Sequence, residues 1–414
     1  MKKFIVPIIV MIILAGVIVS VIGKNQESPG FIINAAFNKD DYQTIISANN
    51  QLGFDILPES EPNKDGNIFI SPTSLLIALS MAYNGADGIT KEEMAKVLYK
   101  EGIEAEQLNK ANASLMSMLL NDFKHSRLEI ANSIWLNNQL QFQDDFAQNV
   151  HDYYNAEIQE VDINSSRTPE IINNWVEIAT NGRIPKIVDE EINPDTAAFL
   201  INAIYFKGDW MHEFDPKHTK KRIFHLGDGT TKEQPLMTLH EKLAYMENED
   251  FQAVILPYAG EKMSMYVFLP KEGSSLEEFR KRLTNDNWEK WKAEFNEKDG
   301  TVLLPKFQLE YDAEWSKALV KLGMTTAFDD EKAVFTKMVK GTKGSVWIDK
   351  VKQKTFINVD EQGSEAAGAT SVKMDTKAAP MDSPFQMEIN RPFFITITNN
   401  ETGTILFLGS ISKP

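Results

Sequence analysis

The sequence predicts one large domain of the α+β class. Segments with helical hydrophobic spacing gather in the first half of the chain, whereas strand-like apolar segments dominate the second half. A chain of 414 residues with 43% hydrophobic content is long enough to bury a substantial core. Neither an internal repeat nor an obvious linker interrupts residues 40–414, so we expect helices and sheets to pack as one body.

Helices are predicted from hydrophobic spacing and from the residues at their starts. Ser71 is a good N-cap and Pro72 suits the first helical turn, so the apolar run behind them predicts a buried helix that ends near Gly85. Thr90 and Glu93 have the spacing of a capping box, which would open the next helix. Further helices are predicted for 40–57, 104–124, 142–156, 168–180 and 314–322.

Strands are predicted where apolar residues alternate or run continuously. Thr196–Phe206 is nearly continuous apolar sequence, as expected of a strand covered on both faces, with Asn202 in its middle. Two segments around Ala259-Gly260 predict a hairpin. The predicted strands are 128–137, 196–206, 251–258, 263–270, 302–309, 345–359, 385–389, 393–398 and 404–410.

Residues 361–377 have a period of two. Every charge falls on an odd position: Glu361, Glu365, Lys373, Asp375 and Lys377. From Ser364 onward the even positions are small or apolar: Ser364, Ala366, Gly368, Thr370, Val372, Met374 and Thr376. Because a strand directs alternate side chains to opposite faces, this segment could form a strand with one buried face. Its Gly and Ala content and the following Ala378-Ala379-Pro380 favour a loop. Two interpretations remain: a loop that later becomes a central strand, or a small-residue surface loop or frayed helix turn.

Composition and motifs argue against most other chemistries. The chain holds no cysteine, which excludes disulfides and thiolate metal sites. Its net charge of −16, with no Lys/Arg-rich run, makes it a poor candidate for binding nucleic acid. His240-Glu241 begins like a zinc-protease motif, but Ala244 stands where the second histidine belongs. No nucleotide-binding or hydrolase signature is present, so we expect neither a cofactor nor a catalytic site.

The N-terminus predicts export. Lys2 and Lys3 precede an uncharged, largely apolar run from Phe4 to Ile22, about long enough to cross a bilayer. Residues 1–23 are therefore interpreted as a cleaved signal or an uncleaved anchor, which predicts a secreted protein or one held at the outer face of the cell membrane. Any membrane contact would run through residues 4–22. The extension 24–39 is expected to be a disordered tether, or alternatively to dock on the body.

Nine motifs in residues 40–414 resemble, in the same order, those of the serpin family of serine protease inhibitors. They are NIFISPTS at 67–74, INNWVE at 172–177 with TNG at 180–182, NAIYFKGDW at 202–210, LPY at 256–258, SMYVFLP at 264–270, LPKF at 304–307, the segment 361–370, RPFF at 391–394 and LFLG at 406–409. The resemblance implies a serpin fold with about nine helices, mostly early in the chain, packed on three β-sheets, with an exposed reactive-centre loop. It also implies a monomer in a metastable native state.

The family mechanism implies a role for the 361–377 segment. A target serine protease attacks the loop and forms an acyl-enzyme, and the cleaved loop then enters the large sheet as a new strand. The hinge residues that this implies are Glu361, Gly363, Ser364, Glu365, Ala366, Ala367, Gly368, Ala369 and Thr370. The alternative is a non-inhibitory binding or carrier protein; such members tend to have bulky, charged or proline residues at the inward hinge positions, and Ser364, Ala366, Gly368 and Thr370 include none.

Two further clusters follow from the resemblance. The shutter, where strands must part, would comprise Ser71, Ser74, Asn202 and Gln353, with Gln353 in place of the family's usual histidine. The breach, where the loop first enters, would comprise Trp210, Lys306 and Glu361, and we expect Lys306 to pair with Glu361.

The bond that the protease would cut is predicted in two ways. Counting seventeen positions from Glu361 gives Lys377–Ala378, and a lysine there predicts a trypsin-like target with an acidic specificity pocket. Counting back from Pro392-Phe393 gives Met381–Asp382 instead. We favour the first bond.

Overall fold

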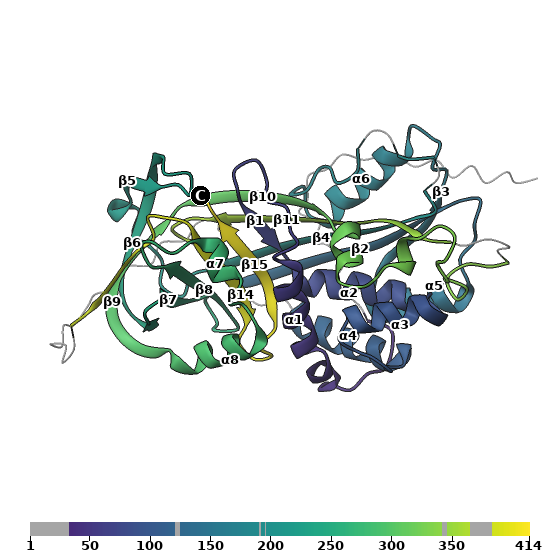
Figure 1. Cartoon of the computed structure of the whole chain (residues 1–414), viewed down its shortest axis with the longest axis horizontal. Coiled ribbons are helices and arrows are strands. Elements are labelled where there is room, and N and C mark those ends of the chain that lie inside the picture. The colour runs from purple at the N-terminus through teal and green to yellow at the C-terminus, as the bar shows by residue number, and fades with distance from the viewer. Residues whose placement is uncertain (1–32, 121–124, 190–191, 195, 342–345, 365–382) are drawn as a thin grey trace, which may run out of the picture. The chain divides into compact units, whose positions relative to one another are not determined.

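The computed structural model describes residues 33–120, 125–189, 192–194, 196–341, 346–364 and 383–414 (Figure 1). Within these ranges the chain forms nine α-helices, six of which precede the long strand β4, so the α+β class with early helices is confirmed. The helices are α1 Ile46–Ile56, α2 Pro72–Tyr83, α3 Gly88–Val97, α4 Ala105–Leu119, α5 Asp144–Tyr154, α6 Thr168–Ala179, α7 Leu276–Arg280, α8 Asn285–Glu294 and α9 Ser316–Lys321.

A six-stranded sheet crosses the molecule. Its members are β2 Ser126–Asn137, β3 Glu157–Val161, β4 Ala198–Asp209, β10 Phe307–Glu314, β11 Ile348–Val359 and the two-residue β12 Gly363–Ser364. β4 and β11 lie side by side in its centre and run parallel, from Ala198 opposite Ile348 to Tyr205 opposite Phe356.

The other described strands form one sheet of nine. They are β1 Ile68–Ile70, β5 Lys220–His225, β6 Thr231–Glu247, β7 Phe251–Pro257, β8 Met263–Pro270, β9 Asn296–Pro305, β13 Phe385–Glu388, β14 Phe393–Asn399 and β15 Ile405–Ile411. The long β6 pairs with β5 at its start, with β9 along its middle and with β7 at its end. Strand pairing therefore gives two sheets among the described residues instead of three, because β6 joins strands that would otherwise form separate sheets.

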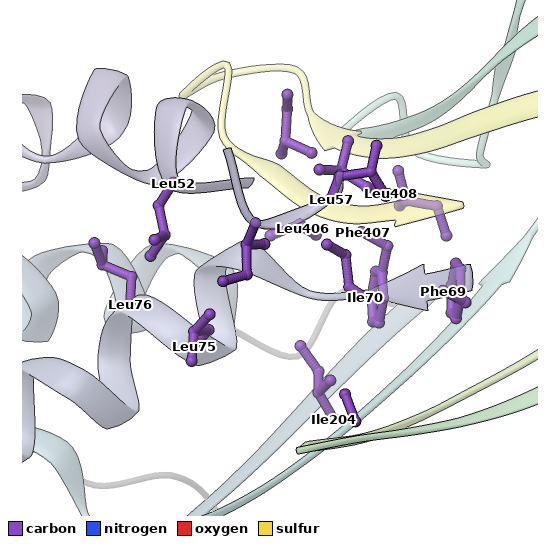
Figure 2. Packing of buried hydrophobic residues seen from close by; sticks show 14 of the residues in the cluster. Leu52, Leu57, Phe69, Ile70, Leu75, Leu76, Ile204, Leu406, Phe407 and Leu408 are labelled. Carbon is purple, nitrogen blue, oxygen red and sulfur yellow. The ribbon is translucent and has the colours of Figure 1, made fainter. Parts of the chain in front are cut away.

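Helix α2 lies between the sheets, and all twelve of its residues are buried. Figure 2 shows Leu75 and Leu76 of α2 beside Leu52 of α1, with β15 above them. Phe69 stacks on Phe407 at 5.1 Å between ring centroids. Since burying each such side chain contributes roughly 1.5–3 kcal/mol, this cluster anchors α2 against both sheets.

Helix α6 covers the opposite face of the six-stranded sheet from α2 (Figure 1). Leu200 and Ile204 of β4 belong to the main core, whereas Phe199, Ile201 and Ala203 pack in a second cluster under α6. Both faces of β4 are thus covered, which explains its continuous apolar sequence.

Two predicted elements differ from the structure. Helix α3 begins after Asp87, whose side chain accepts a hydrogen bond from the Gly88 amide, so the capping box at Thr90 is wrong. The Thr90 hydroxyl lies instead 3.1 Å from that of Thr326. The strand predicted for 302–309 covers the end of β9 and the start of β10, which separate at Lys306.

The described part of the N-terminal extension lies against the body. The amides of Asn34 and Ala35 donate to the Asp152 carbonyl at 3.1 and 3.3 Å, and Ile33 packs on the main core. The expected disordered tether is therefore wrong for residues 33–39, where paired amides and a partly buried isoleucine favour docking. No helix among the described residues is long and apolar enough to span a membrane, and the predicted span 4–22 lies outside them.

Candidate functional site

The seam between β4 and β11 is divided at one end by β12. Past Tyr205 and Phe356 the two long strands no longer pair with each other. Gly363–Ser364 lies between them there, antiparallel to both, with Ser364 opposite Val359 of β11 and both of its residues opposite Gly208–Asp209 of β4. The start of the 361–377 segment is thus a short strand in the centre of the sheet.

Only glycine fits at position 363. A Cβ atom there would collide with the carbonyl oxygen of Gly208 and would lie 2.8 Å from the Asp209 Cα atom. Backbone atoms cannot move aside without breaking the sheet, so the close approach of β12 to β4 depends on this residue.

Ser364 is fully buried, and its hydroxyl lies 2.6 Å from that of Tyr258. Burial raises the pKa of Tyr258, which keeps its phenol protonated and able to donate. Trp210 stacks on Tyr258 at 4.6 Å between ring centroids, and its indole nitrogen donates to the Asp360 carbonyl at 3.0 Å. Tyr258, which was not among the predicted site residues, therefore connects the breach tryptophan to the hinge.

Lys306 and Glu361 form the expected ion pair, with 2.6 Å between Nζ and Oε2. The other oxygen of Glu361 accepts from the Thr219 hydroxyl at 2.8 Å. Burial acts to raise the pKa of Glu361, but the hydrogen bonds from Lys306 and Thr219 and the lysine charge outweigh it, so the pKa is lowered. The carboxylate stays ionised at the base of the loop.

A buried polar cluster spans the middle of the seam. Gln353 accepts from the Ser71 amide at 3.0 Å and donates to the Ser71 carbonyl at 2.9 Å and to Asn202 at 3.1 Å. Asn202 donates to the Ser74 carbonyl at 3.2 Å and to the Asn132 side chain at 2.6 Å. The four predicted shutter residues therefore lie together.

Two details of this cluster were not predicted. The Ser71 hydroxyl caps α2, and the Ser74 hydroxyl is buried without a hydrogen-bond partner among the described residues, so neither hydroxyl crosses the seam. Asn132 also belongs to the cluster. The sequence carried a signal for it, because an asparagine in the middle of each of two apolar strands predicts that they face each other, as Asn132 and Asn202 do.

The rest of the predicted site lies outside the described residues. This holds for hinge residues 365–370 and for both candidate bonds, Lys377–Ala378 and Met381–Asp382. Among the described residues no group of three or more His, Asp or Glu side chains is arranged to hold a metal ion.

Comparison with known proteins identifies the family. The family model "Serpin (serine protease inhibitor)" matches residues 47–414. An uncharacterized serpin-like protein of Thermococcus kodakarensis is 35% identical over 374 residues, which cover 89% of this chain and 86% of that protein. The crystal structure of tengpin, a thermophilic serpin, in its native state matches with a TM-score of 0.82 at 34% identity, covering 94% of this chain and 97% of tengpin.

A further structure, human thyroxine-binding globulin, matches with a TM-score of 0.81 over 90% of this chain and 99% of the globulin, and its 24% identity shows the fold alone. The family match over residues 47–414 and the relative with 35% identity carry the conclusion. The chain belongs to the serpin family, and it has the serpin fold.

Proposed function

We propose that this protein is an irreversible suicide-substrate inhibitor of a trypsin-like serine protease. The protease would cut Lys377–Ala378, and the cleaved loop would enter the six-stranded sheet between β4 and β11 before the acyl-enzyme is hydrolysed. The observation that carries the proposal is the position of β12, which already occupies the entrance of this seam.

The register of β12 supports the assignment of the hinge and the shutter. Ser364 pairs with one residue of each flanking strand. Six residues further along the same antiparallel register, Thr370 would lie opposite Asn202 on one side and Gln353 on the other, and these two already face each other. Inserted Thr370 would therefore replace their direct hydrogen bond with its own hydroxyl. Because Ser364 points into the core, all even positions of the segment would do so too.

The length of β4 favours the first of the two candidate bonds. In the same register Met374 would lie opposite Ala198, the first residue of β4. A cut after Lys377 leaves three residues beyond that point, residues 375–377, whereas a cut after Met381 leaves seven, residues 375–381. Since Ser364 is already in the sheet, insertion as far as Lys377 would carry the attached protease roughly 43 Å at about 3.3 Å per residue.

The free energy that drives inhibition would be the free energy released when the loop forms a new strand in the sheet. Opening the seam breaks the parallel ladder between β4 and β11 and the contact between Asn202 and Gln353. Insertion replaces one ladder by two and buries the small even-numbered side chains. The Lys306–Glu361 pair of the breach would hold the base of the loop until cleavage.

Adduct formation is the direct test. The protein is incubated with trypsin, chymotrypsin and elastase, and the mixtures are run on a denaturing gel. We expect an adduct with trypsin that survives denaturation, and mass spectrometry should find a released peptide that begins at Ala378. A peptide that begins only at Asp382 would overturn the bond assignment. Clean cleavage without any adduct would support the non-inhibitory carrier instead.

The proposal extends to export. Lys2, Lys3 and the apolar run Phe4–Ile22 support secretion or anchorage at the outer face of the membrane, with contact to the bilayer only through residues 4–22. N-terminal sequencing of the exported protein should begin near Lys24 for a cleaved signal and at Met1 for an anchor. Recovery from the soluble cytosolic fraction would contradict export.

A further inference from the structure

A short basic stretch contacts the described residues that flank the 365–382 segment. Five of the six residues from Lys217 to Arg222 are basic, in a chain whose net charge is −16. The expectation that the chain has no Lys/Arg-rich run is therefore wrong for this stretch. The negative net charge of the whole chain gives no sign of it. All five basic residues, Lys217, His218, Lys220, Lys221 and Arg222, are exposed, at the end of the short 3-10 helix Pro216–His218 and along β5.

This basic strip, Lys217–Arg222, contacts the described chain on both sides of the loop. Before the loop, the Thr219 hydroxyl donates to Glu361, three residues ahead of Ser364. After the loop, Arg222 lies 3.5 Å from Glu388 of β13. A body bound to the loop between these two flanks would lie next to the basic strip.

Acidic side chains near the basic strip pair with some of its basic residues but not with all of them. His218 lies 3.9 Å from Asp215 and Lys221 lies 3.4 Å from Glu233. Lys217 and Lys220 form no ion pair among the described residues. Among the described residues, therefore, no carboxylate pairs with either ammonium group.

Resting on the function proposed above, we propose that the basic strip is an exosite for an acidic surface of the target protease, next to the protease's active-site cleft. Lys217 and Lys220 attract that surface and steer the cleft onto the loop. Opposite charges on approaching proteins raise the association rate much more than the final affinity. A faster association with acidic proteases would let the inhibitor select among proteases that share one primary specificity. Without the strip, the net negative charge of the inhibitor would repel an acidic protease.

Two trypsin isoenzymes of the same primary specificity, one anionic and one cationic, test the proposal. The second-order rate of adduct formation is measured for the wild type and for the double variant Lys217→Glu/Lys220→Glu. With anionic trypsin at about 10 mM ionic strength, where charges act over about 30 Å, we expect the variant to react roughly tenfold more slowly. At about 1 M salt, where charges act over only about 3 Å, the two proteins should react at the same rate. With cationic trypsin the variant should not be slower.

A matched control separates the strip from total charge. Lys96 on α3 and Lys317 on α9 are exposed and form no ion pair among the described residues, and α9 leads into the segment that contacts α3 through Thr326. Helix α3 lies at the opposite end of the described structure from β5 (Figure 1). Lys96→Glu/Lys317→Glu makes the same charge change and should leave the rate with anionic trypsin within about twofold of wild type, because a charge beyond the Debye length is screened.

Each remaining outcome decides against the proposal in a distinguishable way. Equal rates for wild type and strip variant, with adducts formed normally, would overturn the exosite and leave the inhibitor function intact. Absence of any adduct would contradict the inhibitor function and the exosite with it. Lysines on an edge strand can also prevent strand pairing between molecules. If the strip variant oligomerised on a sizing column while its rate of adduct formation stayed unchanged, the strip would serve to prevent such pairing and would not be an exosite. Retention of the wild type but not the variant on heparin-agarose, without any difference between isoenzymes, would assign the strip to free polyanions.

Discussion

At the scale of single residues, the site depends on a few side chains that each connect distant parts of the chain. Gln353 joins β11 to the start of α2 and to β4 with three hydrogen bonds. Its amide both donates and accepts, so it fills this position without a group that titrates near neutral pH. These hydrogen bonds hold the seam closed, and under the proposed function the hydroxyl of inserted Thr370 would replace one of them.

Removing this amide should destabilise the native protein. In Gln353→Ala the amide and carbonyl of Ser71 lose buried partners, so we expect the free energy of unfolding to fall by about 2–4 kcal/mol. Chemical denaturation measures the loss. The control Gln308→Ala, at an exposed position of β10 in the same sheet, should stay within about 0.5 kcal/mol of wild type. Equal losses in both variants would contradict the role of the cluster.

Glu361 gives the breach a pH dependence with a definite sign. Because its pKa is lowered in the folded protein, its contribution to stability is complete above the unfolded pKa and is lost as pH falls through the folded value. Glu361→Gln should cost about 1 kcal/mol at pH 7, a modest figure since the Lys306 side chain is 44% exposed. The difference from wild type should shrink as the pH is lowered below about 4.

Denaturation curves at pH 7 and pH 3.5 measure this difference. Glu297→Gln, at an exposed carboxylate without an ion pair among the described residues, is the control and should match wild type at both pH values. A Glu361→Gln effect that grows on acidification would have the wrong sign for an ion pair and would contradict this account.

At the scale of elements, the two residues of β12 decide how the loop meets the sheet. The strand is anchored by Ser364 and requires glycine at 363. The pairing of β12 with β4 and β11 could not be derived from propensity, because β12 is too short for a periodic pattern and its place depends on tertiary pairing.

Gly363→Ala should release β12 from the seam, since the added Cβ collides with the Gly208 carbonyl. We expect the peptide covering 360–364 to exchange its amide hydrogens at least about tenfold faster than in wild type. Gly227→Ala is a matched control, because the nearest atom to its added Cβ is 3.9 Å away. Unchanged exchange in Gly363→Ala would show that β12 tolerates the side chain.

Under the proposed function, Thr370→Arg should make the protein a substrate of the target protease instead of its inhibitor. Thr370 would face the buried amides of the shutter, where an unpaired arginine charge costs several kcal/mol and stalls insertion. Ala369→Arg introduces the same arginine side chain one position earlier. It would lie on the other face of the inserted strand, so this variant should still form the adduct. Gels run with equal protease measure the ratio of adduct to cleaved protein. A normal adduct yield from Thr370→Arg would count against insertion.

At the scale of the whole molecule, the sequence predicted those helices and strands whose capping residues and hydrophobic pattern match their burial in the fold. Ser71 and Pro72 gave the start of α2, and the apolar run of β4 gave a strand covered on both faces. Strand β6 was missed because the polar residues His240, Glu241 and Lys242 follow one another and so interrupt the apolar pattern on both of its faces. The shutter could be predicted as a group through the family motifs, whereas the contact of Tyr258 with Ser364 depends on tertiary packing that no local signal in the sequence reveals.

Under the proposed function, the native fold stores the free energy of a strand that has yet to form. The most direct test is to cut the loop once between residues 371 and 382 with a protease that is not trapped, to verify the cut by mass spectrometry, and to compare thermal melting before and after by circular dichroism. We expect the cut protein to melt more than about 10 °C higher, because a cut loop that joins the sheet replaces the one ladder between β4 and β11 by two and buries its even-numbered side chains. A melting temperature that is unchanged or lower after the cut would contradict this expectation.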